Sequence, residues 1–456
     1  TENYDITGSY LFGERDFDPS SSTFGAIVNP LGAGMYQQYA RNKLNMNVWT
    51  LSHRGTLEGK KHVWLWGNNI ERVLIDDYTR EFEYRDSAGY SLPYQPNASS
   101  VFYSNYSKNH LEITRFNGFI QDNIKRNIGQ SVLTLQSGLR YHYNTLNHEL
   151  LITPRFQSSI QPAWKKDVVF KASIGMYHQP VFYRELKSSG GQLNTFLNAQ
   201  KSVQFAGGMD YQFANAGGKP FRLSTEYYYK YMWDVIAYDI DNVKIRYLGN
   251  NKTKAYATGI EMRLFGELIK DAESWLSIGF MRTREDLEND HYYEYVNANG
   301  EIINANTPDK VIKDSIKRDV GYVRRPTDRL FTMGVFLQDY LATNKNFRVH
   351  LSLLYGSNLP YNIPGSARYR NGLIINPYIR ADIGFSALLL DERNYRRARS
   401  PFRNIKSIWM SFEIFNIINR DNTISYQLIK DYSNNTYAIP NRLTPRMLNI
   451  KLLTRF

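Results

Sequence analysis

The sequence contains no cysteine, which excludes both a disulfide framework and a metal site built on thiolates. It also lacks any run of about 18 consecutive apolar residues, the length that would indicate a transmembrane helix. Only helices and closed barrels satisfy their backbone hydrogen bonds in lipid. Any membrane crossing by this chain must therefore be made by β-strands.

Motifs for catalysis and metal binding are also missing. The eight histidines are scattered, and none forms the HExxH pattern of a zinc site. No Walker A or GxSxG sequence occurs, and Gly32–Gly34 follows a proline, which indicates a turn. We therefore expect no enzymatic activity, no metal site and no cofactor. A Ser/His pair assembled across a barrel rim, as in outer-membrane phospholipases, is the remaining enzymatic alternative.

The charge is strongly positive. Lys and Arg number 56 against 43 Asp and Glu, a net charge of +13 over 456 residues. These basic residues are dispersed, apart from a cluster between Arg393 and Arg403, so we expect no nucleic-acid partner. Attraction to anionic lipid and lipopolysaccharide accounts for the excess. The chain begins at Thr1 without a signal peptide, which we interpret as processing or a missing amino-terminal part.

Apolar and polar residues alternate with a period of two along most of the chain. In the last segment Leu448, Ile450 and Leu452 lie on one face, and Asn449 and Lys451 lie on the other. Tyrosine is abundant, with 35 residues, and Tyr and Trp are enriched where a membrane meets water. The aromatic face at Tyr227, Tyr229, Tyr231 and Trp233 is interpreted as lipid contact and interfacial anchoring.

A soluble β-sandwich would alternate as well, but two features favour a transmembrane antiparallel β-barrel. Many strands span roughly 10 to 20 residues, as a tilted crossing requires. Short turns also alternate with long loops, and the long loops are expected outside. The expected short connections are 58–60, 126–129, 163–166, 215–219, 268–271 and 342–345, and the long ones are 13–38, 87–109, 179–200, 288–327 and 357–376.

Two connections break this alternation: 391–406 is long and 145–148 is short. With 406–428 taken as one strand, the fold class is all-β with about 16 strands in this chain. Charged residues on the polar faces are expected to line the lumen, as a salt-bridged wall or in contact with a plug. They are Arg140, Arg222, Glu226, Lys230, Arg380, Asp382 and Glu413.

Aromatic and Arg side chains in the long loops are the candidate ligand contacts, because they bury large rigid surfaces and donate in fixed geometry. These candidates are Tyr90, Tyr94, Tyr183, Arg184, Tyr361, Arg368 and Tyr369. Packing of one loop on another is the alternative explanation for each of them.

The carboxyl-terminal segment from Met410 to Asn419 resembles the "NLFN"-type signature of TonB-dependent outer-membrane receptors. The run Leu443–Arg446 and the terminal strand to Phe456 follow it as they do in that family. Residues 336–340, 350–360 and 378–386 resemble its Bacteroidota branch. The resemblance covers essentially the whole chain.

The resemblance implies a barrel of about 22 strands with an amino-terminal plug inside. Residues 1–456 are then the barrel domain, with the plug and the first strands absent from this chain. The implied function is active import of a large or scarce ligand, captured at the external loops and driven by TonB through the missing plug domain.

A surface lipoprotein or a larger outer-membrane complex is implied as a further partner, and Phe456 as a signal to the barrel-assembly machinery. Two alternatives remain open. One is a plug-free, porin-like channel. The other is a barrel serving as a structural subunit of a secretion or assembly complex.

Overall fold

A computed structural model describes residues 2–15, 27–86, 101–188, 191–241, 244–269, 272–304, 306–341, 344–362, 366–391, 405–430, 436–443 and 445–456. Apart from one helical turn, α1 (Tyr183–Leu186), the secondary structure of these residues is β. None of the described helices is long and apolar enough to cross a membrane.

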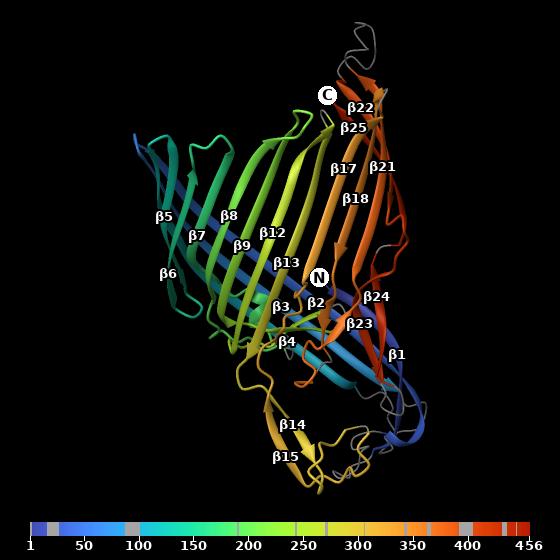
Figure 1. The fold of residues 1–456 in the computed structure, drawn as a ribbon. Coiled ribbons are helices and arrows are strands. Elements are labelled where there is room, and N and C mark those ends of the chain that lie inside the picture. The colour runs from blue at the N-terminus through green and yellow to red at the C-terminus, as the bar shows by residue number, and fades with distance from the viewer. Residues whose placement is uncertain are drawn as a thin grey trace.

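Sixteen strand positions form one curved antiparallel sheet (Figure 1). Each strand pairs with the next one along the sheet, as a series of hairpins requires. β16 (Val323–Arg324) and β17 (Phe331–Leu341) both pair with the same neighbour, and together they fill one position. The other strands are β1 (Glu2–Arg15), β2 (Ile27–Glu58), β3 (His62–Asp86), β4 (Val101–Ile128), β5 (Ser131–Asn144), β6 (Glu149–Gln161), β7 (Asp167–Gln179), β8 (Gln200–Ala214), β9 (Pro220–Val235), β12 (Thr253–Ile269), β13 (Ala272–Leu287), β18 (Asn344–Gly356), β21 (Tyr378–Asp391), β22 (Ser407–Phe415) and β25 (Met447–Arg455).

Among the described residues, four small hairpins lie outside this sheet, all in the long connections. They are β10 (Tyr238–Asp241) with β11 (Lys244–Tyr247), β14 (His291–Val296) with β15 (Asp314–Asp319), β19 (Leu359–Tyr361) with β20 (Leu373–Ile375), and β23 (Asn422–Lys430) with β24 (Thr436–Leu443). The β14–β15 hairpin projects beyond the end of the sheet (Figure 1).

The two populations of connections lie at opposite ends of the strands, as the sequence predicts. Tight turns follow β2, β4, β6 and β8 at one end, and the carboxyl terminus lies at this same end (Figure 1). The long connections and α1 lie at the other end. The turn at 145–148 is short, as expected, and His148 there adopts a φ of 55°.

The sheet has two open edges. β1 pairs only with β2, and β25 pairs only with β22, and no pairing joins β1 to β25 among the described residues. An unpaired strand edge exposes a row of N–H and C=O groups, which lipid cannot satisfy. Sixteen strand positions confirm the expected number for this chain, and the described sheet is not closed by itself.

Two expectations about local structure are wrong. Residues 13–38 were expected to be a loop containing a Gly32–Gly34 turn, yet β1 continues to Arg15 and β2 begins at Ile27. Pairing between these strands overrides the turn-forming residues, with a register shift between Phe12 and Gly13 that absorbs the irregularity near Pro30. β4 likewise begins at Val101, so the expected 87–109 loop is shorter than predicted.

The segment 406–428 is also not one strand. β22 ends at Phe415, and Asn416 and Asn419 then adopt φ values of 50° and 52°. The Asn416 side chain holds this turn, because its Oδ1 accepts from the Arg420 N–H at 3.2 Å and its Nδ2 donates to the Arg420 carbonyl at 3.0 Å. The alternation breaks at this turn, where Ile417 and Ile418 are adjacent and residues 419–422 are all polar, so the prediction of one strand overlooked a turn signal. The number of sheet strands is unaffected, since β22 pairs directly with β25.

Candidate functional site at the mouth of the sheet

The connection between β7 and β8, residues 180–199, packs onto one face of β3 and β4. Its Val181, Tyr183, Leu186 and Leu197 form one buried cluster with strand residues and with Ile236, which follows β9. The strand residues in this cluster are Val73, Ile75, Leu111 and Ile113. Neighbouring strands lie about 4.8 Å apart, so positions as distant as β3 and β9 can share a cluster only if the sheet curves toward it. We call this concave side the inner face.

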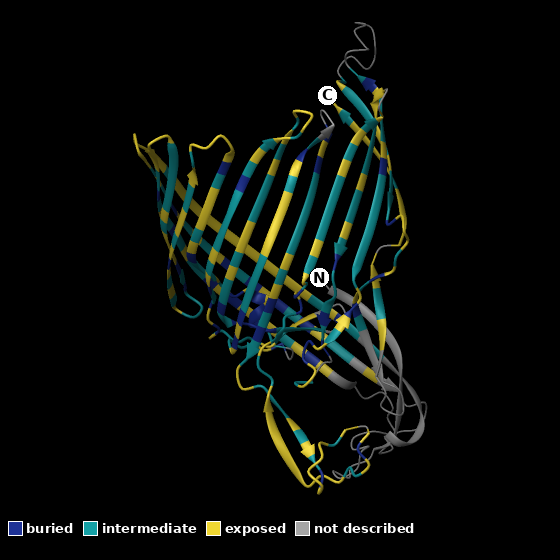
Figure 2. Ribbon diagram, viewed as in Figure 1, coloured by how far each residue is buried: buried dark blue, intermediate teal, exposed yellow. Residues whose placement is uncertain are grey.

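Buried positions gather around this cluster at the end with the long connections (Figure 2). Polar contacts fix the same connection in place. Lys187 Nζ lies 2.6 Å from Asp77 Oδ2 and donates to the Thr79 hydroxyl as well. Asn109 Nδ2 donates to the Gly191 carbonyl at 3.1 Å. A Cβ on Gly191, whose φ is +80°, would lie 2.7 Å from Ser107 Oγ, so only glycine allows this approach.

Two ionisable groups of the connection are perturbed by this packing. Burial raises the pKa of the Tyr183 hydroxyl, and the negative charge of Asp77 raises it further. Burial also raises the pKa of Glu185, against the opposing effect of the hydrogen bonds that its carboxylate accepts. Those bonds come from the Phe182 N–H at 2.9 Å and from Gln200 Nε2 at 2.9 Å.

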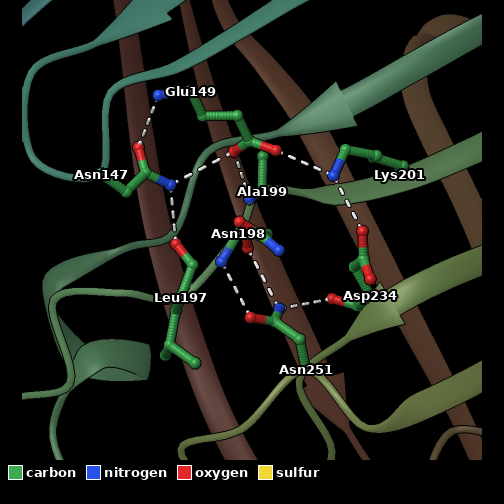
Figure 3. Close-up of polar contacts among 8 residues, drawn as sticks. All are labelled: Asn147, Glu149, Leu197, Asn198, Ala199, Lys201, Asp234 and Asn251. Atoms are coloured by element: carbon green, nitrogen blue, oxygen red, sulfur yellow. Dashed lines mark hydrogen bonds and ion pairs between the residues drawn. The ribbon is translucent and has the colours of Figure 1, made fainter.

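A polar network joins three connections at the mouth (Figure 3). Glu149 Oε1 lies 2.8 Å from Lys201 Nζ, and Lys201 Nζ lies 2.8 Å from Asp234 Oδ2. The other Glu149 oxygen accepts from the Ala199 N–H at 2.7 Å. One carboxylate therefore holds both the end of the 180–199 connection and the start of β8.

Asn251 extends this network to the connection between β9 and β12. Its Oδ1 accepts from the Asn198 N–H at 2.8 Å, and its Nδ2 donates to the Asp234 carbonyl at 2.7 Å. Asn147, in the short turn, donates to the Leu197 carbonyl at 2.8 Å. Side-chain amides thus satisfy loop backbone groups that no sheet ladder reaches.

A buried ion cluster holds two further connections. Glu285 on β13 is fully buried, and its carboxylate lies 3.1 Å from Arg325 Nε and 2.8 Å from Arg370 Nη2. Arg325 belongs to the segment before β17, and Arg370 belongs to the connection between β18 and β21. Arg324 pairs with Asp328 in the same segment at 2.7 Å.

The structure brings only some of the sequence-predicted ligand contacts together. Arg368 and Tyr369 are exposed, and the Arg368 guanidinium lies 5.5 Å from the ring centre of Tyr292 on β14. Tyr361 packs separately against Tyr426, with ring centres 4.9 Å apart. Tyr90 and Tyr94 lie outside the described residues.

The two candidates in the 180–199 connection differ from each other. Tyr183 is buried in the inner cluster, whereas Arg184 beside it is exposed. Loop packing therefore accounts for the position of Tyr183. Sequence reasoning missed Lys187 and Glu285 as residues that hold the loops, because their neighbours in the sequence do not indicate which distant charged residue each one will contact.

Phe456 is 76% exposed at the end of β25.

Charged residues on the inner face form ion pairs at several of the expected positions. Arg222 lies 2.7 Å from Asp210, which also pairs with Lys171. Arg380 and Asp382 lie 2.8 Å apart along β21. Among the described residues, no group of three or more His, Asp or Glu is arranged to hold a metal ion.

One part of the inner face is apolar and uncovered. Leu44, Met46 and Val48 on β2 are 47%, 49% and 51% exposed. Their cross-strand partners on β3 are Asp77, Ile75 and Val73. Because directly opposed residues share a face, this patch lies beside the cluster that the 180–199 connection covers. We call these three residues the β2 inner patch.

Comparisons with known proteins give structural likeness only. No family model matches the chain, and no curated protein matches it. Among solved structures, the ferric yersiniabactin uptake receptor FyuA from Yersinia pestis aligns over 93% of this chain with a TM-score of 0.56 and 11% identity. The copper transporter OprC aligns over 92% with a TM-score of 0.54 and 11% identity.

The outer-membrane transporter YddB from Escherichia coli aligns over 95% of the chain with a TM-score of 0.51 and 13% identity. The chain spans 58%, 61% and 57% of the lengths of FyuA, OprC and YddB, respectively. At these identities the likeness establishes the fold, which is that of the barrels of outer-membrane transporters and receptors.

Proposed function

We propose that this chain is the carboxyl-terminal part of the barrel of an outer-membrane active-transport receptor. It spans the outer membrane, with the long connections outside and the tight turns in the periplasm. A large or scarce ligand is captured at the long connections and imported with energy from TonB. The main support is the shared fold with outer-membrane transporters over more than nine-tenths of the chain.

The β2 inner patch supports a plugged receptor over an open porin-like channel. The interior of a water-filled barrel is polar, whereas Leu44, Met46 and Val48 place about half-exposed apolar side chains on the inner face. An apolar surface on this face is stabilised when a folded domain covers it. We assign that role to a plug domain encoded ahead of Thr1, which also carries the contact with TonB.

The open edges of β1 and β25 support the same proposal. In a barrel of about 22 strands, further strands pair with both edges and leave none exposed to lipid. Residues 1–456 then form the later part of the barrel domain, and the preceding strands complete it.

Among the candidate ligand contacts, Arg368 and Tyr369 have the strongest support, because they are exposed beside Tyr292 of the projecting hairpin. Arg184 is the exposed candidate of the 180–199 connection. We expect an Arg368→Ala, Tyr369→Ala double variant to lower uptake while the protein remains at normal levels in the membrane.

The first experiment is the intact mass of the native protein from outer membranes, with amino-terminal sequencing. The proposal predicts a mass well above the 53.2 kDa of this chain, together with capture of the protein by the purified periplasmic domain of TonB. A native mass that matches the chain would contradict the proposal and favour the porin-like channel.

A further inference from the structure

Two histidines that lie far apart in the sequence meet near the mouth of the sheet. His142 is on β5 and only 2% exposed, and His178 is on β7. Their ring centres lie 5.2 Å apart with an interplanar angle of 40°. β6 stands between these strands in the sheet, but its pairing with β7 ends at Arg155 and Gly175. Beyond that point the strands part, and the two rings come together.

Both rings carry a buried nitrogen without a hydrogen-bond partner. His142 Nδ1–H donates to Asn117 Oδ1, so Nε2 is the deprotonated nitrogen of the neutral ring. Among the described residues, neither His142 Nε2 nor His178 Nδ1 has a partner. A buried polar atom left unsatisfied costs about 1–3 kcal/mol. These two atoms belong to adjacent rings, whose centres lie 5.2 Å apart.

The separation of the rings agrees with that expected for two ligands of one metal ion. A metal ion lies about 2.0–2.1 Å from an imidazole nitrogen, and therefore about 3.2 Å from the ring centre. Two rings bound at the tetrahedral angle of about 109° then have centres about 5.2 Å apart. The observed separation is 5.2 Å.

The surroundings of His142 also fit a metal ligand. A coordinating histidine usually donates its other N–H to a carbonyl or carboxylate oxygen, which fixes the tautomer. Asn117 Oδ1 accepts that bond here. Charged groups of both signs act electrostatically on the rings: Glu149 acts on both, Arg115 acts on His142, and Arg155, Arg140 and Lys201 act on His178.

Nearby cations determine what else could bind. Arg115 is paired with Glu71 at 2.9 Å, and Lys201 is paired with Glu149. Arg155 stacks 4.0 Å from the ring centre of Tyr177, and Arg140 stacks 5.6 Å from that of Phe119. Two protein donors leave coordination positions open, and these guanidinium groups favour anionic oxygen donors there.

We propose that His142 Nε2 and His178 Nδ1 bind one divalent transition-metal ion near the mouth of the sheet, where β6 and β7 part, with small anionic oxygen ligands or water in the remaining positions. Imidazole suits zinc, copper, nickel and cobalt ions. This site is distinct from the exposed loop candidates. It requires neither TonB nor a transported ligand.

The test uses the full-length protein in detergent, without a polyhistidine tag, stripped with EDTA and titrated with Co²⁺. The proposal predicts saturation at one ion per protein and visible absorption bands of a four- or five-coordinate ion. His142→Asn keeps a donor for Asn117 and removes Nε2, and His178→Gln removes Nδ1. We expect each variant to bind Co²⁺ at least about tenfold more weakly.

His110→Asn is the matched control, because the His110 side chain is 67% exposed and pairs with Asp76 outside this site. It should bind as the wild type does. Heat-dependent electrophoretic mobility checks that every variant is folded. Wild-type affinity in both site variants, or no saturable binding by the wild type, would overturn the proposal and assign the two nitrogens to a bridging water.

Discussion

Two neighbouring parts of the inner face differ in what covers them. The cluster around Val73 and Ile113 is buried under residues 180–199 of the same chain. The β2 inner patch, one strand away, is about half exposed. Both surfaces are apolar and lie on the same face. The comparison teaches that apolar side chains inside this sheet are docking surfaces, of which the described chain covers only one.

The covered part also shows how a long loop is held. Apolar contacts bury the side chains of the loop against β3 and β4. The Lys187–Asp77 ion pair ties the middle of the loop to β3, and Glu149 holds its end. The β2 inner patch presents only an apolar surface, and the described chain places no loop on it. We therefore expect the two surfaces to respond differently to equivalent changes.

The largest expected effect comes from truncating a side chain on each surface. Leu186→Ala should lower the free energy of unfolding by about 2–5 kcal/mol, because Leu186 is fully buried. Met46→Ala should lower it by less than Leu186→Ala does, because the described chain leaves Met46 49% exposed. Urea unfolding in lipid vesicles measures both. Equal losses in the two variants would remove the distinction between the surfaces.

The next effect concerns the ion pair. Lys187→Met leaves Asp77 buried without its cation, at a cost of about 3 kcal/mol. The 180–199 connection should then become sensitive to limited proteolysis. Arg184→Ala, at an exposed position in the same turn, is the control and should retain wild-type resistance. Cleavage of both variants at the same rate would show that the ion pair does not fix the loop.

The smallest effect depends on pH. Burial raises the pKa of Glu185 above its ordinary value, so the folded state binds the proton more tightly than the unfolded state. Stability from this group is therefore complete below the ordinary pKa of about 4.3 and is lost as pH rises through the folded pKa. After correction for the intrinsic base-catalysed exchange rate, the hydrogen-exchange protection factors of the α1 amides should be higher at the lower end of this window. Glu185→Gln should abolish that dependence, and its persistence in the variant would assign it to another group.

The sequence predicts the repeating part of the fold well. Alternation along segments such as 221–233 and 448–456 indicates strands, their faces and their approximate number, because every strand in a sheet repeats the same local rule. It fails where pairing overrides local composition, as at Gly32–Gly34, and where a short turn between two alternating segments is overlooked, as at Asn416.

The candidate site is less predictable from sequence. Aromatic and Arg residues in loops mark where contacts occur, but not whether they face solvent, so Tyr183 and Arg184 differ although they are neighbours. The His142–His178 pair is set by sheet register and by where β6 and β7 part. Neither the register of the strands nor the point where β6 and β7 part can be read from a single sequence.

The central claim is that a plug domain covers the β2 inner patch in the native protein. Residues 1–456 contain no cysteine, so Met46→Cys provides the single thiol of this part of the protein for reaction with a hydrophilic maleimide. Lys60→Cys, in an exposed tight turn, is the control. The account predicts that Met46→Cys reacts much more slowly than Lys60→Cys in the detergent-solubilised native protein, but at a similar rate once the protein is unfolded in urea. Equal rates in the native protein would contradict it.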